Sequence, residues 1–178
     1  MAKVLNYGMV GGGPDAFIGD AHRRAISLDE SARLVAGVFS RNAEKSKKMG
    51  EVLHIEEERC YKDYETMALE EAKREDGIDF VVVVTPNASH YEICKAFLNA
   101  GIHVVCDKPV TTTYEKAVEL QKLAEEKSLL FMVTYTYMGH VTAKYARDLI
   151  AFGAIGDVRA VMAEYPQGWL AFEDNVGG

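Results

Sequence analysis

The 178-residue sequence predicts an α/β fold with a doubly wound parallel sheet. Three observations support this prediction: short β-rich runs alternate with longer helical patterns, glycines follow the first apolar run directly, and polar motifs follow two later runs. Such alternation is typical of repeated βαβ units, whose strands lie parallel. The composition, 48% hydrophobic and 26% charged, is that of an average globular protein with a packed core.

Five strands are expected, each a short run rich in β-branched or aromatic residues. They span residues 4–10, 34–39, 80–84, 103–106 and 129–134. Apolar side chains recur at helical spacing between them, which predicts helices at residues 41–49, 63–75, 88–100 and 114–127. Residues 59–61 are interpreted as a short edge strand.

A first domain is expected to span residues 1–134, and a second to begin at residue 135. The chain then becomes aromatic and turn-like, residues 143–152 have a helical pattern, and residues 157–165 alternate like a strand with one exposed face. A lone strand needs neighbours that the remaining residues cannot supply. We therefore interpret residues 135–178 as the beginning of an incomplete α+β domain.

Composition and charge exclude several classes of partner. The formal charge of −7 argues against nucleic acid, and the longest apolar run is far shorter than the roughly 20 residues of a membrane helix. The N-terminus lacks the pattern of a secretory signal, so we expect a cytoplasmic protein. The cysteines are expected to be buried free thiols, and no metal site is expected because the histidines lack metal-ligand spacing.

Glycines after the first strand predict a dinucleotide-binding loop, which would make the sheet a Rossmann NAD(P)-binding fold. Gly11 permits the tight turn, and Gly13 lets the backbone approach a pyrophosphate held by helix N-terminal amides. The third motif position is open: Ala16 completes Gly-x-Gly-x-x-Ala, whereas Gly19 lies where the helix proper runs. We favour a lengthened loop with Gly19 giving the close helix contact; a glycine-rich turn without a ligand is the alternative.

The end of the second strand carries no carboxylate to bond a ribose 2′-hydroxyl. Ser40 can donate a hydrogen bond, and Arg41 can offer a planar fork to a 2′-phosphate, with Lys45 one helical turn on. This favours NADP over NAD as the cofactor. In the alternative interpretation Ser40 caps the following helix and Arg41 is a solvated charge, which leaves NAD open.

Two polar motifs follow the third and fourth strands, at the rim where open α/β sheets bind ligands. Thr-Pro-Asn-Ala-Ser-His occupies residues 85–90, and Cys-Asp-Lys-Pro occupies residues 106–109. Together with the glycine loop, and over essentially the whole chain, they resemble the Gfo/Idh/MocA family of oxidoreductases. That family shows Thr-Pro-x-x-x-His and Glu-Lys-Pro in this order and spacing.

The resemblance implies roles for the residues of both motifs. Lys108 would be the catalytic residue, reaching the cofactor ribose and the substrate carbinol, where an ammonium stabilises developing negative charge. Asp107, implied as a cofactor-binding residue, departs from the family's Glu by one methylene, so it keeps the charge with a shorter reach. The remaining cofactor-binding residues implied are Thr85, Pro86, Asn87, His90 and Pro109. In the family this proline often follows a cis peptide bond, and the histidine caps or packs at the start of its helix.

The resemblance also implies an NAD(P)-dependent dehydrogenase that transfers hydride between the cofactor and a carbinol of a sugar, polyol or related metabolite. His140 and Tyr137, where the chain re-enters the cleft region, are candidates for substrate contact. Family members carry a second domain for substrate binding and association, so the full-length form is expected to be a homo-oligomer. The alternative is a non-catalytic nucleotide-binding module or an inactive remnant; the chain alone is expected to bind cofactor without turnover.

Overall fold

The computed structural model describes residues 3–14, 16–166 and 168. The chain divides into two compact units, Met1–Tyr135 and Thr136–Gly178.

The first unit is built on a five-stranded sheet in which every neighbouring pair is parallel. The strands are β1 (Leu5–Gly11), β2 (Ala32–Val38), β3 (Phe80–Val84), β4 (His103–Cys106) and β5 (Phe131–Val133), in the spatial order β2-β1-β3-β4-β5. The chain therefore builds the sheet outward from β1 in both directions, which confirms the predicted doubly wound α/β fold.

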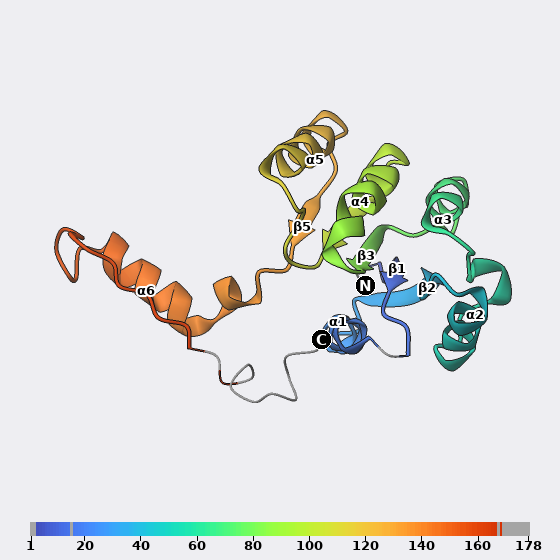
Figure 1. Ribbon diagram of the computed structural model, residues 1–178, viewed down its shortest axis with the longest axis horizontal. Helices are drawn as coiled ribbons and strands as arrows, with labels where there is room; N and C mark the ends of the chain where they lie inside the picture. The colour runs from blue at the N-terminus through green and yellow to red at the C-terminus, as the bar shows by residue number, and fades with distance from the viewer. Residues whose placement is uncertain (1–2, 15, 167, 169–178) are drawn as a thin grey trace. The chain divides into compact units, whose positions relative to one another are not determined.

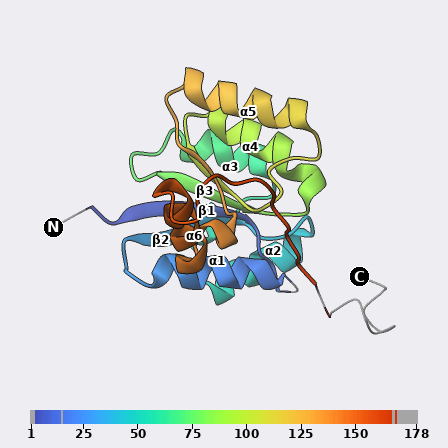
Figure 2. The ribbon, with the colours of Figure 1, turned by 90° about the vertical axis from the view of Figure 1, so that its left-hand side faces the viewer.

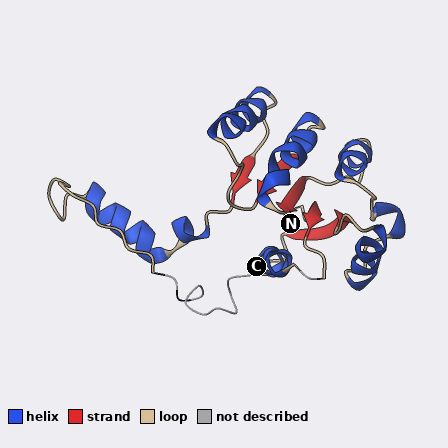
Figure 3. Cartoon of the chain, viewed as in Figure 1, coloured by secondary structure: helices blue, strands red, loops and turns tan. Residues whose placement is uncertain are grey.

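Helices cover both faces of this sheet. They are α1 (Phe17–Ser27), α2 (Ala43–Val52), α3 (Tyr64–Glu71), α4 (His90–Asn99) and α5 (Tyr114–Glu126). The helices α3, α4 and α5 lie on one face and α1 and α2 on the other, as two perpendicular views show (Figures 1 and 2). The strands form the middle layer (Figure 3).

The core consists of one apolar layer on each face of the sheet, and β3 contributes to both. Val81 and Val83 pack with Phe97 of α4 and the other helices of their face, whereas Val82 and Val84 pack on the opposite face, which includes Met49 of α2. Alternate strand residues point to opposite faces, so a strand covered on both sides must be apolar throughout. This requirement explains the unbroken valine run.

The predicted edge strand at residues 59–61 is wrong. Glu57–Arg59 form a 3-10 turn, η1, and only Cys60 makes an isolated parallel bridge to Gly37. The buried Arg59 guanidinium forms an ion pair with the Glu71 carboxylate of α3, which also accepts hydrogen bonds from the Tyr61 hydroxyl and the Ile78 amide. This side-chain network takes the place of a strand ladder.

The second unit contains the 3-10 turn η3 (Thr136–Gly139) and helix α6 (Val141–Ala151). The expected strand at residues 157–165 is wrong, because the structure describes these residues as exposed chain without strand pairing. A strand is stable only with a hydrogen-bonded neighbour, and the described part of this unit offers none. Across the described ranges, no helix is long and apolar enough to cross a membrane.

Candidate functional site

The glycine loop lies against the ends of three strands and has no room for side chains. Gly11 has φ +94°, and a Cβ there would lie 2.7 Å from the carbonyl oxygen of Val84 at the end of β3. A Cβ on Gly13 would lie 2.6 Å from the carbonyl oxygen of Phe39, just beyond β2. These contacts are with backbone, which cannot move aside, so both positions require glycine.

Helix α1 passes this loop at backbone contact. A Cβ on Gly19 would lie 2.4 Å from the Cα of Gly12, so the close helix contact expected of Gly19 is present. Arg23, one turn further along, donates from Nη1 to the Gly12 carbonyl at 3.0 Å. This contact of Arg23 was not predicted from the sequence, although its position four residues after Gly19 places it on the same helix face.

The N-cap residue of α1 supplies no side-chain cap. This residue is Ala16, and its own amide donates to the Gly13 carbonyl at 3.0 Å. By contrast, Asn42 caps α2 and Asp63 caps α3 through side-chain oxygens. Uncapped amides at a helix N-terminus attract an anion.

A cavity of about 610 Å³ opens at the carboxyl edge of the sheet. It is bounded by the glycine loop, by the residues after β2, by the residues after β3 and by the first turn of α4. The predicted residues on its wall are Gly11, Gly13, Ala16, Ser40, Arg41, Thr85 and Pro86. Three segments far apart in the sequence thus share one cavity, at the place where doubly wound sheets bind ligands.

The wall beyond β2 is cationic. Arg41 is exposed there, and Lys45 lines the same wall. The Ser40 hydroxyl oxygen accepts from the Asn42 amide at 3.1 Å, whereas Asn42 Oδ1 accepts from the Lys45 amide at 3.0 Å. Asn42 is therefore the cap of α2, and the interpretation of Ser40 as that cap is wrong. The helix begins at Ala43, two residues after the predicted start at Arg41.

The residues just before and within the first turn of α3 form the opposite wall of this region, and the sequence analysis missed them. They are Lys62, Asp63, Tyr64 and Glu65. The hydrogen bond from Thr66 holds the pKa of Asp63 low, and burial raises the pKa of Tyr64 to about 12, so its phenol is neutral. No local sequence pattern marks them: these residues follow Cys60, whose bridge to β2 leads the chain to the same edge.

The Thr-Pro-Asn loop leads from β3 into α4 through the 3-10 turn η2 (Asn87–Ser89). The Ser89 hydroxyl oxygen lies 2.8 Å from both Thr85 Oγ1 and the Pro86 carbonyl oxygen, which fixes the turn. Thr85 and Pro86 reach the cavity wall, but Asn87 is exposed and lies off it.

His90 is the first residue of α4 and lies in the core, not on the cavity wall. Its ring is fully buried, with Nδ1 2.8 Å from the Pro109 carbonyl oxygen and Nε2 2.7 Å from the Thr85 carbonyl oxygen. Both ring nitrogens are occupied, so His90 cannot contact the cofactor directly. Any influence of His90 on the cofactor would therefore be indirect, through the two loops that the ring joins.

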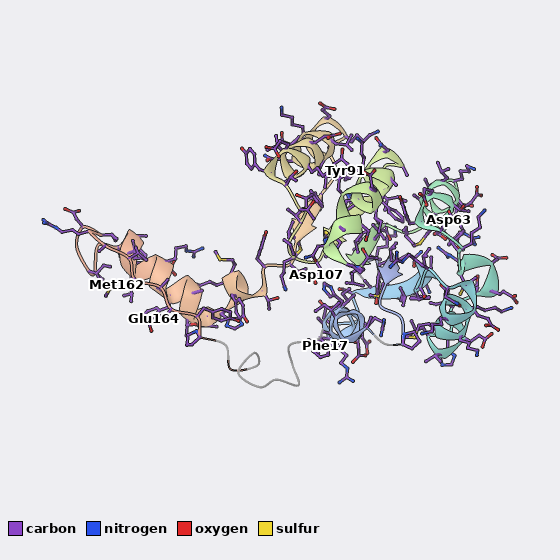
Figure 4. All side chains as sticks on the ribbon, viewed as in Figure 1. Phe17, Asp63, Tyr91, Asp107, Met162 and Glu164 are labelled. Atoms are coloured by element: carbon purple, nitrogen blue, oxygen red, sulfur yellow. The ribbon has the colours of Figure 1, made fainter. Side chains whose placement is uncertain are left out.

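Asp107, Lys108 and Pro109 follow β4, beside the cavity but not on its wall. The peptide bond between Lys108 and Pro109 is cis, as the resemblance implied, and Lys108 is exposed. Asp107 accepts from Thr134 Oγ1 at 2.9 Å and lies 3.6 Å from His22 Nε2 of α1. Figure 4 labels Asp107 at this position and Asp63 at the start of α3. The hydrogen bond from Thr134 therefore anchors the shorter aspartate.

The residues predicted for substrate contact lie in the second unit. The Tyr137 and His140 rings meet edge to face at 5.5 Å between centroids, and the Tyr137 hydroxyl is hydrogen-bonded to that of Tyr165. Their role in substrate binding stays a prediction. Cys60, Cys94 and Cys106 are free thiols, and the described residues hold no cluster of three or more metal-binding side chains.

Comparison with known proteins gives a consistent result. Residues 5–135 match the family model described as an oxidoreductase family with an NAD-binding Rossmann fold, designated GFO_IDH_MocA. The chain is 43% identical to the oxidoreductase YfiI of Bacillus subtilis over 175 residues, which is 98% of this chain and 44% of YfiI. It is 34% identical to the scyllo-inositol 2-dehydrogenase (NADP(+)) IolW of the same organism over 97 residues, 54% of this chain and 27% of IolW.

Solved structures agree with this match. An inositol dehydrogenase homologue of Azotobacter vinelandii, in complex with NAD+, is 42% identical with a TM-score of 0.86, covering 89% of this chain and 41% of that one. The same homologue with NADH and myo-inositol gives the same TM-score of 0.86. The chain spans less than half the length of these relatives.

Proposed function

The chain belongs to the Gfo/Idh/MocA family of oxidoreductases, and from that premise we propose that it binds NADP and serves hydride transfer to or from a carbinol of a polyol or sugar. One observation carries the proposal. The glycine loop, the residues after β2 and the Thr-Pro loop line a single cavity at the carboxyl edge of the sheet. A dinucleotide needs these three neighbouring subsites for pyrophosphate, adenosine ribose and nicotinamide ribose.

The residues present fit a dinucleotide. Gly11 and Gly13 leave space that any Cβ would fill, so phosphate oxygens can approach the backbone there. The uncapped first amides of α1 would hold the pyrophosphate charge. Thr85 and Pro86 would line the nicotinamide ribose at the end of β3.

NADP is the preferred cofactor in this proposal because three basic side chains, Arg41, Lys45 and Lys62, line the adenosine end beside the carboxylates of Asp63 and Glu65. Arg41 can present two N–H groups to a 2′-phosphate, and Ser40 can donate from its hydroxyl. Lys62 faces the same region across the cavity. An acidic residue suited to a free 2′-hydroxyl is missing from the end of β2.

Lys108 is the proposed catalytic residue. When bound, the nicotinamide supplies the hydride acceptor or donor. The Lys108 ammonium would bind the substrate oxygen, stabilise negative charge on it and exchange a proton with it. Asp107 supports this role because its carboxylate accepts a hydrogen bond from Thr134 Oγ1, which anchors the segment from which Lys108 extends.

Substitution of Lys108 tests this function. We expect Lys108→Gln to lower kcat about a hundredfold or more. The variant is introduced at the chromosomal locus, so that the protein is assayed as the gene encodes it. The assay uses NADP and a panel of cyclic polyols and aldoses. Its melting temperature should stay nearly unchanged, because Lys108 is exposed. Lys73→Gln, an exposed lysine on a surface ion pair with Glu70, is the matched control and should keep full activity. Cofactor binding without any turnover by the unaltered protein would favour a non-catalytic nucleotide-binding module.

A further inference from the structure

The buried ring of His90 joins the two motif loops of the site. Thr85 lies in the loop after β3, and Pro109 lies in the loop after β4. The ring bridges their carbonyl oxygens, with N···O distances of 2.7 Å to Thr85 and 2.8 Å to Pro109. The loops are separated by about twenty residues in the sequence, and His90 is fully buried between them.

The chemistry of the partners defines the charge of the ring. A carbonyl oxygen has lone pairs and no hydrogen, so it can only accept. Two carbonyls at hydrogen-bond distance require a hydrogen on both ring nitrogens, and an imidazole with both nitrogens protonated is a cation. A neutral tautomer would instead set one nitrogen lone pair against a carbonyl lone pair.

The surroundings decide whether such a cation is stable in the core. Desolvation lowers the pKa of His90, but Cys106 of β4 and the two carbonyls outweigh it and raise the pKa to about 9. The hydrogen bond with Cys94 of α4 lowers the pKa of the Cys106 thiol, and His90 lowers it further, whereas the Asp107 charge acts in the opposite direction. The start of α4 disfavours a cation through the helix dipole, so the carbonyls and Cys106 must also offset that term.

We propose that His90 is a protonated positioning residue, a cationic clamp that holds the Thr85-Pro86 loop and the Lys108-Pro109 loop at a fixed separation. This inference rests on the proposed function for its consequence: Pro86 lines the cofactor cavity and Lys108 carries the proposed chemistry, so the clamp sets the distance between them. The ring itself touches neither cofactor nor substrate.

The protonation of the ring can be measured without any ligand. In the 178-residue chain labelled with 15N-histidine, we expect both His90 nitrogens to show imidazolium chemical shifts at pH 8. This pH is well above the pKa of about 6.5 of a free imidazole. The ring should lose its proton only near pH 9. The signal is assigned by its absence in His90→Gln. If His90→Gln does not fold, through-bond correlation of the ring with the assigned backbone amide of His90 identifies the signal instead. A neutral ring at pH 8 would overturn the proposal.

The positioning role is tested by cofactor affinity. In His90→Gln, amide resonances of both loops, at Asn87 and at Val110, should shift together, and the dissociation constant for NADPH should rise about tenfold. The affinity of the unaltered chain should fall as the pH rises through about 9, and that of the variant should not. His103→Gln is the control, because His103 Nδ1 accepts from the Leu130 amide and bridges no motif loops.

The two ideas fail in different ways. If the unaltered chain does not bind NADPH, the proposed function fails, whereas the ring shifts and the coupled loop shifts still decide the clamp. If His90→Gln leaves both loops undisturbed, or binds NADPH as tightly as the unaltered chain with the same pH profile, the clamp is refuted.

Discussion

Replacing Gly19 by alanine sets two physical effects against each other. Gly19 is the third residue of α1, and alanine in a helix is more favourable than glycine by about 1 kcal/mol. On propensity alone, Gly19→Ala should stabilise the protein. The contact with the glycine loop predicts the opposite sign.

The structure decides which effect is larger. The new Cβ would lie 2.4 Å from Gly12 Cα and 3.2 Å from Gly12 C, both backbone atoms. A separation of 2.4 Å is well inside van der Waals contact, so α1 has to move away from β1. Overpacking of this kind costs roughly 1 to 3 kcal/mol, which leaves a net loss of up to about 2 kcal/mol after the propensity gain.

The displacement should also weaken cofactor binding, because it moves the open amides of α1 away from the loop. We expect a fall in melting temperature of about 2 to 4 °C for each kcal/mol and an NADPH dissociation constant raised about tenfold. Thermal unfolding and fluorescence titration measure the two quantities. Gly139→Ala is the control, since a Cβ there meets nothing within 4 Å. A Gly19→Ala chain that is more stable and binds NADPH equally well would refute the reasoning.

Three further predictions concern the adenosine end and the core. Arg41→Ala should weaken NADPH binding about tenfold or more and leave NADH binding unchanged, with Arg24→Ala, an exposed arginine of α1, as control; equal losses for both cofactors would contradict a 2′-phosphate site. Glu71→Gln removes the buried counter-charge of the Arg59 guanidinium, leaving the exposed Asp76 carboxylate as its ion-pair partner, and should lower the free energy of unfolding by about 3 kcal/mol in urea titrations. The exposed Glu70→Gln should change it by less than about 0.5 kcal/mol, and similar values for both variants would argue against the buried pair. Asn42→Ala removes the cap of α2 and should cost about 1 kcal/mol in the same measurement; no loss would mean that the cap is dispensable.

The parallel sheet was predictable because its signals are local. A valine run with no polar face indicates a strand covered on both sides, and the observed β3 has the bounds expected for it. The glycine loop was predictable for the same reason. Gly11 and Gly13 lie so close to other backbone that a side chain would not fit at either position.

The remainder depends on contacts that no local pattern encodes. Residues 157–165 alternate like a strand, but alternation describes a face and not the neighbour that a strand must pair with. The buried position of His90 is likewise matched by carbonyl oxygens from two loops. Every residue has a backbone carbonyl, so no sequence pattern indicates which carbonyls a buried ring will meet. Lys62 and Tyr64 reach the cavity because a single bridge at Cys60 directs the chain, which is too short a signal to read from sequence.

The central claim is that one dinucleotide site joins three segments at the carboxyl edge of the sheet. Chemical-shift mapping tests it most directly: NADPH is titrated into the 15N-labelled chain and the backbone amide resonances are followed. The account predicts saturable shifts concentrated at Gly11–Gly13, at Ser40 and Arg41, and at Thr85 and the residues that follow Pro86. Shifts that do not saturate, or that fall mainly on residues 136–151, would contradict it.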